Sequence, residues 1–68
     1  METTTIKVNG MTCAGCTAAV ERVLRALDGV GNVSVSLNDA QATVEFESGR
    51  VSVDDMRGAI EDAGYDAA

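Results

Sequence analysis

The chain contains two cysteines, Cys13 and Cys16, with two residues between them. They follow an alternating apolar run (Ile6, Val8) and precede a segment of helical periodicity, so they lie where a strand leads into the first turn of a helix. The N-terminus of a helix carries roughly half a positive charge from its unpaired N–H groups. A thiolate is stabilised there, and its pKa falls below the free value of about 8.5. We expect this field to act most on Cys16, and Cys13 to be the more exposed thiol.

Two close thiolates of this kind suit three tasks: holding a soft metal ion, cycling between dithiol and disulfide, or supplying half of a zinc site. Thioredoxin-like oxidoreductases also place C-x-x-C at a strand-to-helix junction, but they usually carry a cis-proline opposite the motif, and this chain has no proline. A zinc site needs four ligands, whereas the chain offers two cysteines and no histidine. Copper(I) fits better, because it is a soft ion that two sulfurs can hold.

Length and composition exclude several other functions. The 68 residues form one domain (1–68), which is too small to build a deep substrate cavity and therefore argues against an enzyme. The net charge of −6 and the near absence of aromatic residues argue against binding nucleic acid or anionic lipid. No stretch approaches the ~20 apolar residues of a membrane span, and no signal peptide is visible. We therefore expect a cytoplasmic protein with no stable membrane association.

Apolar periodicity predicts six elements in the order β-α-β-β-α-β. The predicted strands cover residues 4–9, 32–38, 41–47 and 65–68, and the predicted helices cover residues 14–28 and 53–63. Thr12 and Ser52 are the candidate N-caps, and Gly29 and Gly64 are expected to end the helices. This order predicts an α+β, ferredoxin-like sandwich, in which two helices cover one face of a four-stranded antiparallel sheet.

The same patterns predict which side chains form the core. The residues expected to face inward are Ile6, Val8, Val20, Val23, Leu24, Leu27, Val33, Val35, Leu37, Ala42, Val44, Phe46, Val53, Met56, Ile60 and Ala63.

The sequence from Gly10 to Cys16 (Gly-Met-Thr-Cys-Ala-Gly-Cys) resembles the G-M-T-C-x-x-C signature of the heavy-metal-associated (HMA) domain family, in particular its bacterial copper chaperones. Residues 27–30 (Leu-Asp-Gly-Val) look like the end of the first helix of that family. Residues 63–66 (Ala-Gly-Tyr-Asp) resemble the glycine-tyrosine end of its second helix. The resemblance covers essentially the whole chain, and its parts are specific when they occur together.

The resemblance implies a ferredoxin-like fold and copper(I) held by Cys13 and Cys16. It implies a soluble, non-enzymatic metallochaperone that passes Cu(I) by thiolate exchange to the metal-binding domain of a copper-transporting P-type ATPase. Zinc- and cadmium-type relatives usually carry Asp at the position of Thr12, whereas mercury-binding relatives share the Thr. Many bacterial copper chaperones carry His at the position of Gly15, so this chain lacks that extra ligand.

Two alternative functions stay open. The chain could be the detached metal-binding domain of a copper or mercury transporter or reductase, or it could be a C-x-x-C thiol oxidoreductase. We expect a monomer, with a copper-bridged homodimer as the alternative state.

Several residues near the motif each have two interpretations. Met11 is either a third sulfur ligand or an anchor in the core, and the resemblance favours the anchor. Tyr65 either tunes the thiolates or covers the end of the core. Arg22 and Arg25 either form a solvated helix face or dock an acidic partner. The entire net charge of −6 arises from Asp39 onward, because the charges before it cancel.

Overall fold

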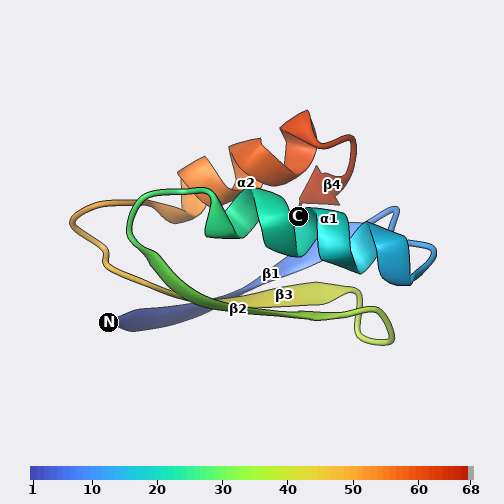
Figure 1. Cartoon of the computed structure of the whole chain (residues 1–68), viewed down its shortest axis with the longest axis horizontal. Coiled ribbons are helices and arrows are strands. Elements are labelled where there is room, and N and C mark those ends of the chain that lie inside the picture. Colours follow the sequence, from blue (N-terminus) through green and yellow to red (C-terminus); the bar gives the residue numbers. More distant parts are fainter. Residues whose placement is uncertain (68) are drawn as a thin grey trace.

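Alternating apolar residues along four segments produce an antiparallel sheet with the strand order β2-β3-β1-β4. The structure is a computed structural model that describes residues 1–67. Its elements are β1 (Glu2–Asn9), α1 (Ala14–Arg25), β2 (Val30–Ser36), β3 (Gln41–Phe46), α2 (Val53–Asp62) and β4 (Asp66–Ala67). Both helices cover the same face of the sheet (Figure 1). The predicted ferredoxin-like βαββαβ sandwich is therefore confirmed.

The connections between elements gather at two opposite ends of the molecule. The β1–α1 loop, the β2–β3 turn and the α2–β4 connection lie at one end, whereas the α1–β2 turn and the β3–α2 loop lie at the other (Figure 1). The first end brings the two cysteines close to the residues that follow α2. The second end places the last turn of α1 beside the start of α2.

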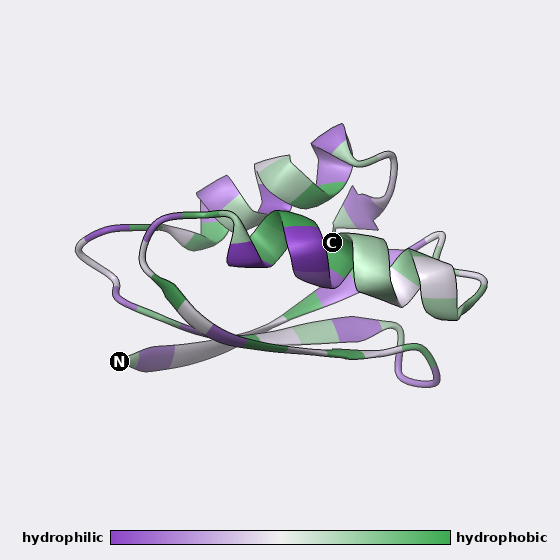
Figure 2. Cartoon of the chain, in the orientation of Figure 1, coloured by the Kyte–Doolittle hydropathy of each residue, from purple (hydrophilic) through white to green (hydrophobic). Residues whose placement is uncertain are grey.

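The core lies between the sheet and the helices, and all of its buried side chains are hydrophobic in the described part of the chain. Hydrophobic and hydrophilic bands alternate along both helices in Figure 2, which is typical of helices with one buried face. The buried residues are Ile6, Val8, Val20, Leu24, Val33, Ala42, Val44, Phe46, Val51, Met56 and Ile60. All of these except Val51 belong to the predicted inward faces. No helix among residues 1–67 has the length and apolar character to span a membrane.

Two core assignments differ from the prediction. Leu37 was expected to face inward, but it is 39% exposed. The reason is that β2 ends at Ser36, so Leu37 opens the β2–β3 turn, in which the Ala40 N–H donates to the Leu37 carbonyl at 3.3 Å. Val51 was assigned to no face because it lies in a loop without periodicity. Its side chain is 5% exposed and closes the core between β3 and α2.

Helix α1 begins and ends at other residues than predicted. The N-cap is Cys13 and not Thr12, and it makes no side-chain capping hydrogen bond among the described residues. The helix ends at Arg25, three residues before the predicted Asp28. Its last turn tightens there, because the Leu27 N–H donates to the Leu24 carbonyl at 3.1 Å. Gly29, at φ +100°, then turns the chain toward β2, and a Cβ at this position would lie 2.7 Å from the Cβ of Arg50.

Helix α2 has a complete cap at each end. Ser52 and Asp55 form the predicted capping box, in which each side chain accepts a backbone N–H at 3.1 Å. At the other end, Gly64 adopts φ +97°, as predicted. The Gly64 N–H donates to the Glu61 carbonyl at 3.0 Å and the Tyr65 N–H donates to the Ile60 carbonyl at 3.2 Å, which is a Schellman motif. This motif fixes where Tyr65 leaves the helix.

The strands differ from the prediction mainly at their ends. β1 starts two residues earlier than predicted, β2 is shifted toward the N-terminus by two residues, and β3 ends at Phe46. The predicted last strand (65–68) is observed as Asp66–Ala67, so Tyr65 precedes it and Ala68 lies outside the described residues. β4 pairs with β1 at two positions, Val8 with Ala67 and Asn9 with Asp66. These pairs join the C-terminal end of the fold to the strand that leads into the cysteines.

The first prediction concerns two glycines that differ only in backbone conformation. Apart from its chain neighbours and the backbone of its own helix, no atom of the described residues lies within 4 Å of a Cβ placed on Gly58 or on Gly64. Gly58 lies inside α2 with ordinary helical geometry, so Gly58→Ala should stabilise the fold by roughly 0.5–1 kcal/mol. For a domain of this size, this corresponds to a rise in Tm of roughly 2–8 °C. Gly64→Ala should lower Tm, because alanine is strained at φ +97°.

Thermal unfolding followed by circular dichroism measures both variants under one set of conditions. Shifts of the same sign in the two variants would contradict this account of the two positions.

Candidate metal site

The two cysteines lie together at the junction between β1 and α1. Cys13 is the N-cap of α1 and is exposed, whereas Cys16 is the third residue of the helix and is half-buried. Both thiols are free, and their Sγ atoms are 3.5 Å apart. The Cys13 carbonyl accepts the N–H groups of Cys16 and Thr17, at 3.0 and 3.3 Å, so the first turn of the helix sets the spacing of the pair. The structure thus brings the two predicted ligands into one exposed site.

Hydrogen bonds stabilise the thiolate form of Cys16 and lower its pKa from 9.0 to about 6. The largest cause is the backbone N–H of Thr12, followed by hydrogen bonds from the Tyr65 hydroxyl, the Cys13 thiol and the Thr12 hydroxyl, whose oxygen lies 3.8 Å from the Cys16 Sγ. Partial burial acts in the opposite direction and is the smaller effect. The stabilisation expected from the helix N-terminus is therefore supplied by individual hydrogen-bond donors around the Sγ atom of Cys16.

Tyr65 lies beside the loop that carries the cysteines. Its ring packs against the hydrophobic core, and a Cβ placed on Gly10 would lie 3.7 Å from its Cδ1 atom. The pKa of Tyr65 is raised, first because its hydroxyl hydrogen-bonds to Cys16 and then because of burial and the nearby sulfur charges. Both predicted interpretations therefore describe Tyr65: it covers the end of the core and contacts the thiolate.

Met11 and Arg25 each had two interpretations, and the structure favours one for each residue. Met11 is half-buried and packs against the core, as the anchor interpretation predicted. Arg25 makes an ion pair with Glu21 at 3.0 Å and donates to the Val33 carbonyl at 3.5 Å. Its guanidinium is thereby tied to its own molecule, which favours the solvated-face interpretation for this residue.

Among residues 1–67, the candidate site offers two atoms that could bind a metal ion, the Sγ atoms of Cys13 and Cys16. No group of three or more His, Cys, Asp or Glu side chains in this part of the chain converges so as to hold a metal ion. Two metal–thiolate bonds of about 2.3 Å span more than the 3.5 Å between the Sγ atoms. A linear S–metal–S arrangement therefore requires the sulfurs to separate, and the exposed Cys13 side chain is the one with room to move. Such a donor set is suited to a soft ion of low coordination number.

Sequence reasoning missed one part of the site. It assigned no role to the backbone N–H of Thr12, because a main-chain donor leaves no signal in residue type. It did place Tyr65 near the thiolates, and the structure agrees, because a Cβ placed on Gly10 would lie 3.7 Å from the Cδ1 atom of Tyr65.

Comparison with known families matches residues 5–66 to the heavy-metal-associated domain. The chain belongs to the heavy-metal-associated domain family. The match includes most of β1, both helices and the C-x-x-C motif, so the family resemblance noted from the motif is confirmed.

Several members of the heavy-metal-associated family are similar to this chain along almost their whole length. The copper chaperone CopZ of Bacillus subtilis (strain 168) is 47% identical over 68 residues, which are 100% of this chain and 99% of that relative. A solved structure of a CopZ metallochaperone is 39% identical with a TM-score of 0.96, and covers 98% of this chain and 100% of its own. A copper binding domain from HMA7, a P-type ATPase, is 40% identical with a TM-score of 0.97. It covers 100% of this chain and 92% of its own. The same fold thus occurs in a chaperone and in a transporter domain.

The second prediction concerns the ionisation of Cys16. In the reduced, metal-free protein, Cys16 should lose its proton with a midpoint near pH 6, because four donors favour its thiolate. Tyr65→Phe keeps the ring and removes the hydroxyl, so the midpoint should move to higher pH. Thr12→Val is the matched control: it keeps the backbone N–H, which is the largest cause of the low pKa, and should produce a smaller shift.

The chemical shift of the Cys16 Cβ in protein labelled with ¹³C-cysteine, measured against pH, reports this midpoint for one residue. A Tyr65→Phe midpoint identical to that of the unmodified chain would rule out the contribution of the hydroxyl.

Proposed function

We propose that this protein is a Cu(I) carrier in which Cys13 and Cys16 are the two ligands. The observation that carries the proposal is the pair of free thiols 3.5 Å apart, in a loop where no third His, Cys, Asp or Glu side chain of residues 1–67 joins them. Cu(I) is soft and accepts two sulfur ligands, whereas Zn²⁺ requires four ligands. The low pKa of Cys16 supports the proposal, because a thiolate present at neutral pH need not release a proton to bind metal. The copper chaperone CopZ relative supports the choice of copper.

In the proposed transfer, a thiolate of the partner attacks the bound Cu(I) and forms a three-coordinate intermediate. One sulfur of this chain then leaves, the second partner thiolate bonds to the metal, and the last sulfur leaves. Copper stays in the +1 state throughout, and each departing thiolate is replaced by one arriving thiolate. The exposure of Cys13 makes it the natural first leaving group. No substrate bond is broken, so the protein acts as a carrier and not as an enzyme.

The proposed partner is the metal-binding domain of a copper-transporting P-type ATPase. The structure of the HMA7 domain supports it, because the two folds are alike and facing C-x-x-C loops of similar domains can share one ion. We place the exchange in the cytoplasm, where a reducing environment keeps both thiols free. The carrier is proposed to work as a monomer, with a copper-bridged homodimer as the competing state.

A thiol oxidoreductase is the second candidate function, and the short separation of the Sγ atoms favours it. A C-x-x-C pair at a helix N-terminus with one low-pKa thiol is also the arrangement of disulfide exchange enzymes. Reduction of insulin disulfides by the reduced protein separates the two functions. A carrier should show no turnover in this assay, whereas an oxidoreductase should.

The third prediction tests the ligands. In an anaerobic titration against a chromophoric Cu(I) chelator, the reduced chain should bind one equivalent of Cu(I) tightly. Replacing either cysteine by serine removes half of the donor set, so Cys13→Ser and Cys16→Ser should each lose the tight site, while Met11→Leu should keep it. The same titration with Hg(II) measures the preference between the two soft ions. Weak or non-stoichiometric Cu(I) binding by the unmodified chain would overturn copper carriage.

The fourth prediction tests transfer. The ¹⁵N-labelled, Cu(I)-loaded chain is mixed with the metal-free N-terminal metal-binding domain of a copper-transporting ATPase. The amide resonances of the Cys13–Cys16 loop should move to their metal-free positions, because the partner thiolates compete for the ion. An ATPase domain whose own two cysteines are replaced by serine is the control and should leave the resonances unchanged. Retention of copper by the chain with both partners would refute transfer to this class of domain.

A further inference from the structure

Strand β2 lies at one edge of the sheet, because the strand order is β2-β3-β1-β4. One side of its backbone pairs with β3, and the other side faces no strand of residues 1–67. Its sequence, Val-Gly-Asn-Val-Ser-Val-Ser, contains no charged residue and no proline. Proteins usually protect such an edge with charges, proline or a bulge, because its unpaired N–H and C=O groups can pair with another chain. β2 has a bulge between Val30 and Asn32, but its pairing with β3 is regular from Val33 onward.

The alternation of hydrogen bonds identifies which main-chain groups of β2 face the open edge. In an antiparallel ladder, alternate residues direct both their N–H and C=O groups toward the same neighbouring strand. The Val8 N–H donates to the Ala40 carbonyl at 2.8 Å, so the even-numbered residues of β3 bond to β1 and its odd-numbered residues bond to β2. Those odd-numbered residues are opposite the serines of β2. The valines that alternate with the serines, Val33 and Val35, therefore direct their main-chain groups to the open edge.

The side chain of Arg25 covers one of these groups. From the last turn of α1, its Nη2 donates to the Val33 carbonyl at 3.5 Å. This contact is independent evidence that the carbonyl faces away from β3. Glu21, one helical turn earlier, accepts from the Nε of the same guanidinium at 3.0 Å. Glu21 therefore orients Arg25 so that its guanidinium lies on the edge of β2.

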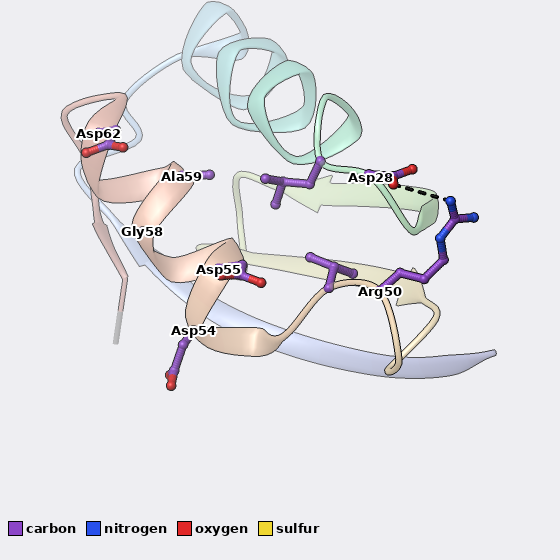
Figure 3. A pocket seen from close by; sticks show the side chains of 9 residues that line it. Asp28, Arg50, Asp54, Asp55, Gly58, Ala59 and Asp62 are labelled. Carbon is purple, nitrogen blue, oxygen red and sulfur yellow. Dashed lines mark hydrogen bonds and ion pairs between the residues drawn. The ribbon is translucent and has the colours of Figure 1, made fainter.

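Arg25 differs in this respect from two other arginines that form ion pairs. Arg50 pairs with Asp28 at 3.3 Å, and Figure 3 shows its side chain extended toward that carboxylate. Arg57 lies 3.6 Å from Asp54 on its own helix. Both of these pairs join one side chain to another. Arg25 also bonds to the main chain of a strand, so its contact closes part of an edge in addition to balancing a charge.

The open edge of β2 is complementary to the same edge of a second copy. When two β2 strands run antiparallel about a two-fold axis at Ser34, Val33 of each copy lies opposite Val35 of the other. The main-chain groups of these valines then form four hydrogen bonds, two in each pair. No like charges meet across the axis, because the strand is uncharged. The opposite edge of the sheet does not offer such a pair, because β4 consists of Asp66–Ala67.

We propose that β2 pairs with β2 of a second copy, and that Arg25, oriented by Glu21, prevents this pairing in the monomer. In each copy the guanidinium occupies the Val33 carbonyl, so it blocks two of the four hydrogen bonds. Displacement of Arg25 allows two four-stranded sheets to join into one. Because the paired strands run in opposite directions, the two cysteine pairs lie at opposite ends of the dimer. This pairing requires no metal, so it goes beyond Cu(I) carriage and differs from a copper-bridged dimer.

Sedimentation velocity of the reduced full chain, with a chelator present to exclude copper bridges, tests the proposal. Arg25→Ala should strengthen dimerisation by at least about fivefold, because two more hydrogen bonds can form. Arg22→Ala is the matched control: it removes the same charge from an exposed position of the same helix and should not strengthen dimerisation. An Arg25→Ala chain that is as monomeric as the unmodified chain at millimolar concentration would overturn the proposal.

A charge placed at the two-fold axis tests the register of the pairing. Ser34→Lys added to Arg25→Ala should abolish the dimer, because the two lysines would lie opposite each other. Thr5→Lys added to Arg25→Ala is the control, since Thr5 is also exposed on the sheet but lies two strands away from the axis, and it should keep the dimer. A dimer that persists with Ser34→Lys, or that is lost equally with Thr5→Lys, would contradict pairing through β2.

Hydrogen exchange of individual amides locates the interface. In the unmodified monomer, the amides of Val33 and Val35 should exchange faster than that of Ser34, which bonds to β3. In the Arg25→Ala dimer, the two valine amides should be protected, because each donates across the new strand pair. Dimerisation that leaves both valine amides unprotected would overturn the proposal, because the copies would then associate through another surface. The Cu(I) titration of the unmodified chain is a separate measurement, so a failure of copper carriage would be distinguishable from a failure of this proposal.

Discussion

The site depends on the N-terminus of α1 being left without a conventional cap. Its N-cap residue is Cys13, whose side chain makes no capping hydrogen bond among the described residues, and its first turn contains no acidic side chain. The N-terminus of helix α2, in contrast, is capped by a reciprocal capping box and carries two aspartates in its first turn. The positive end of α2 is neutralised by its own side chains. The positive end of α1 remains available to the sulfur atoms, so the two helices differ in how their N-terminal N–H groups are satisfied.

Most of the fold followed from the sequence, because its periodic signals are physical requirements of burial. Strands such as Gln41–Phe46 alternate because one face meets the helices, and Ser52 caps a helix because its hydroxyl reaches a free N–H group. The errors occur where the sequence pattern and the end of an element do not coincide. Leu37 continues the alternation of β2 although the strand has ended, and Thr12 is a good capping residue that lies one position too early. Buried Val51 belongs to a loop, where a pattern of faces cannot exist.

The cysteine pair of the candidate site was predictable, and its surroundings were predictable only in part. Cys13 and Cys16 are visible as a pair because both are side chains of one residue type at a fixed spacing. The donors that lower the pKa of Cys16 include a main-chain N–H of Thr12 and a hydroxyl from the other end of the chain. The first has no residue signature, and the second requires the whole βαββαβ topology before Tyr65 can be placed. Sequence spacing thus identifies the candidate ligands, and tertiary structure decides how strongly the thiolate form of Cys16 is favoured.

The Schellman motif at the end of α2 gives the thiolate a dependence on distant parts of the fold. The chain consists of two βαβ halves, β1-α1-β2 and β3-α2-β4. Tyr65 is fixed to the second half, because its N–H donates to the Ile60 carbonyl and the preceding Gly64 N–H donates to the Glu61 carbonyl, whereas Cys16 belongs to the first half. The effect of the Tyr65 hydroxyl on the pKa of Cys16 therefore acts between the two βαβ halves of the chain. The two β1–β4 residue pairs also join these halves. The pKa of Cys16 consequently depends on how the two halves are packed together. A pH titration of Cys16 is therefore also a measure of the tertiary structure.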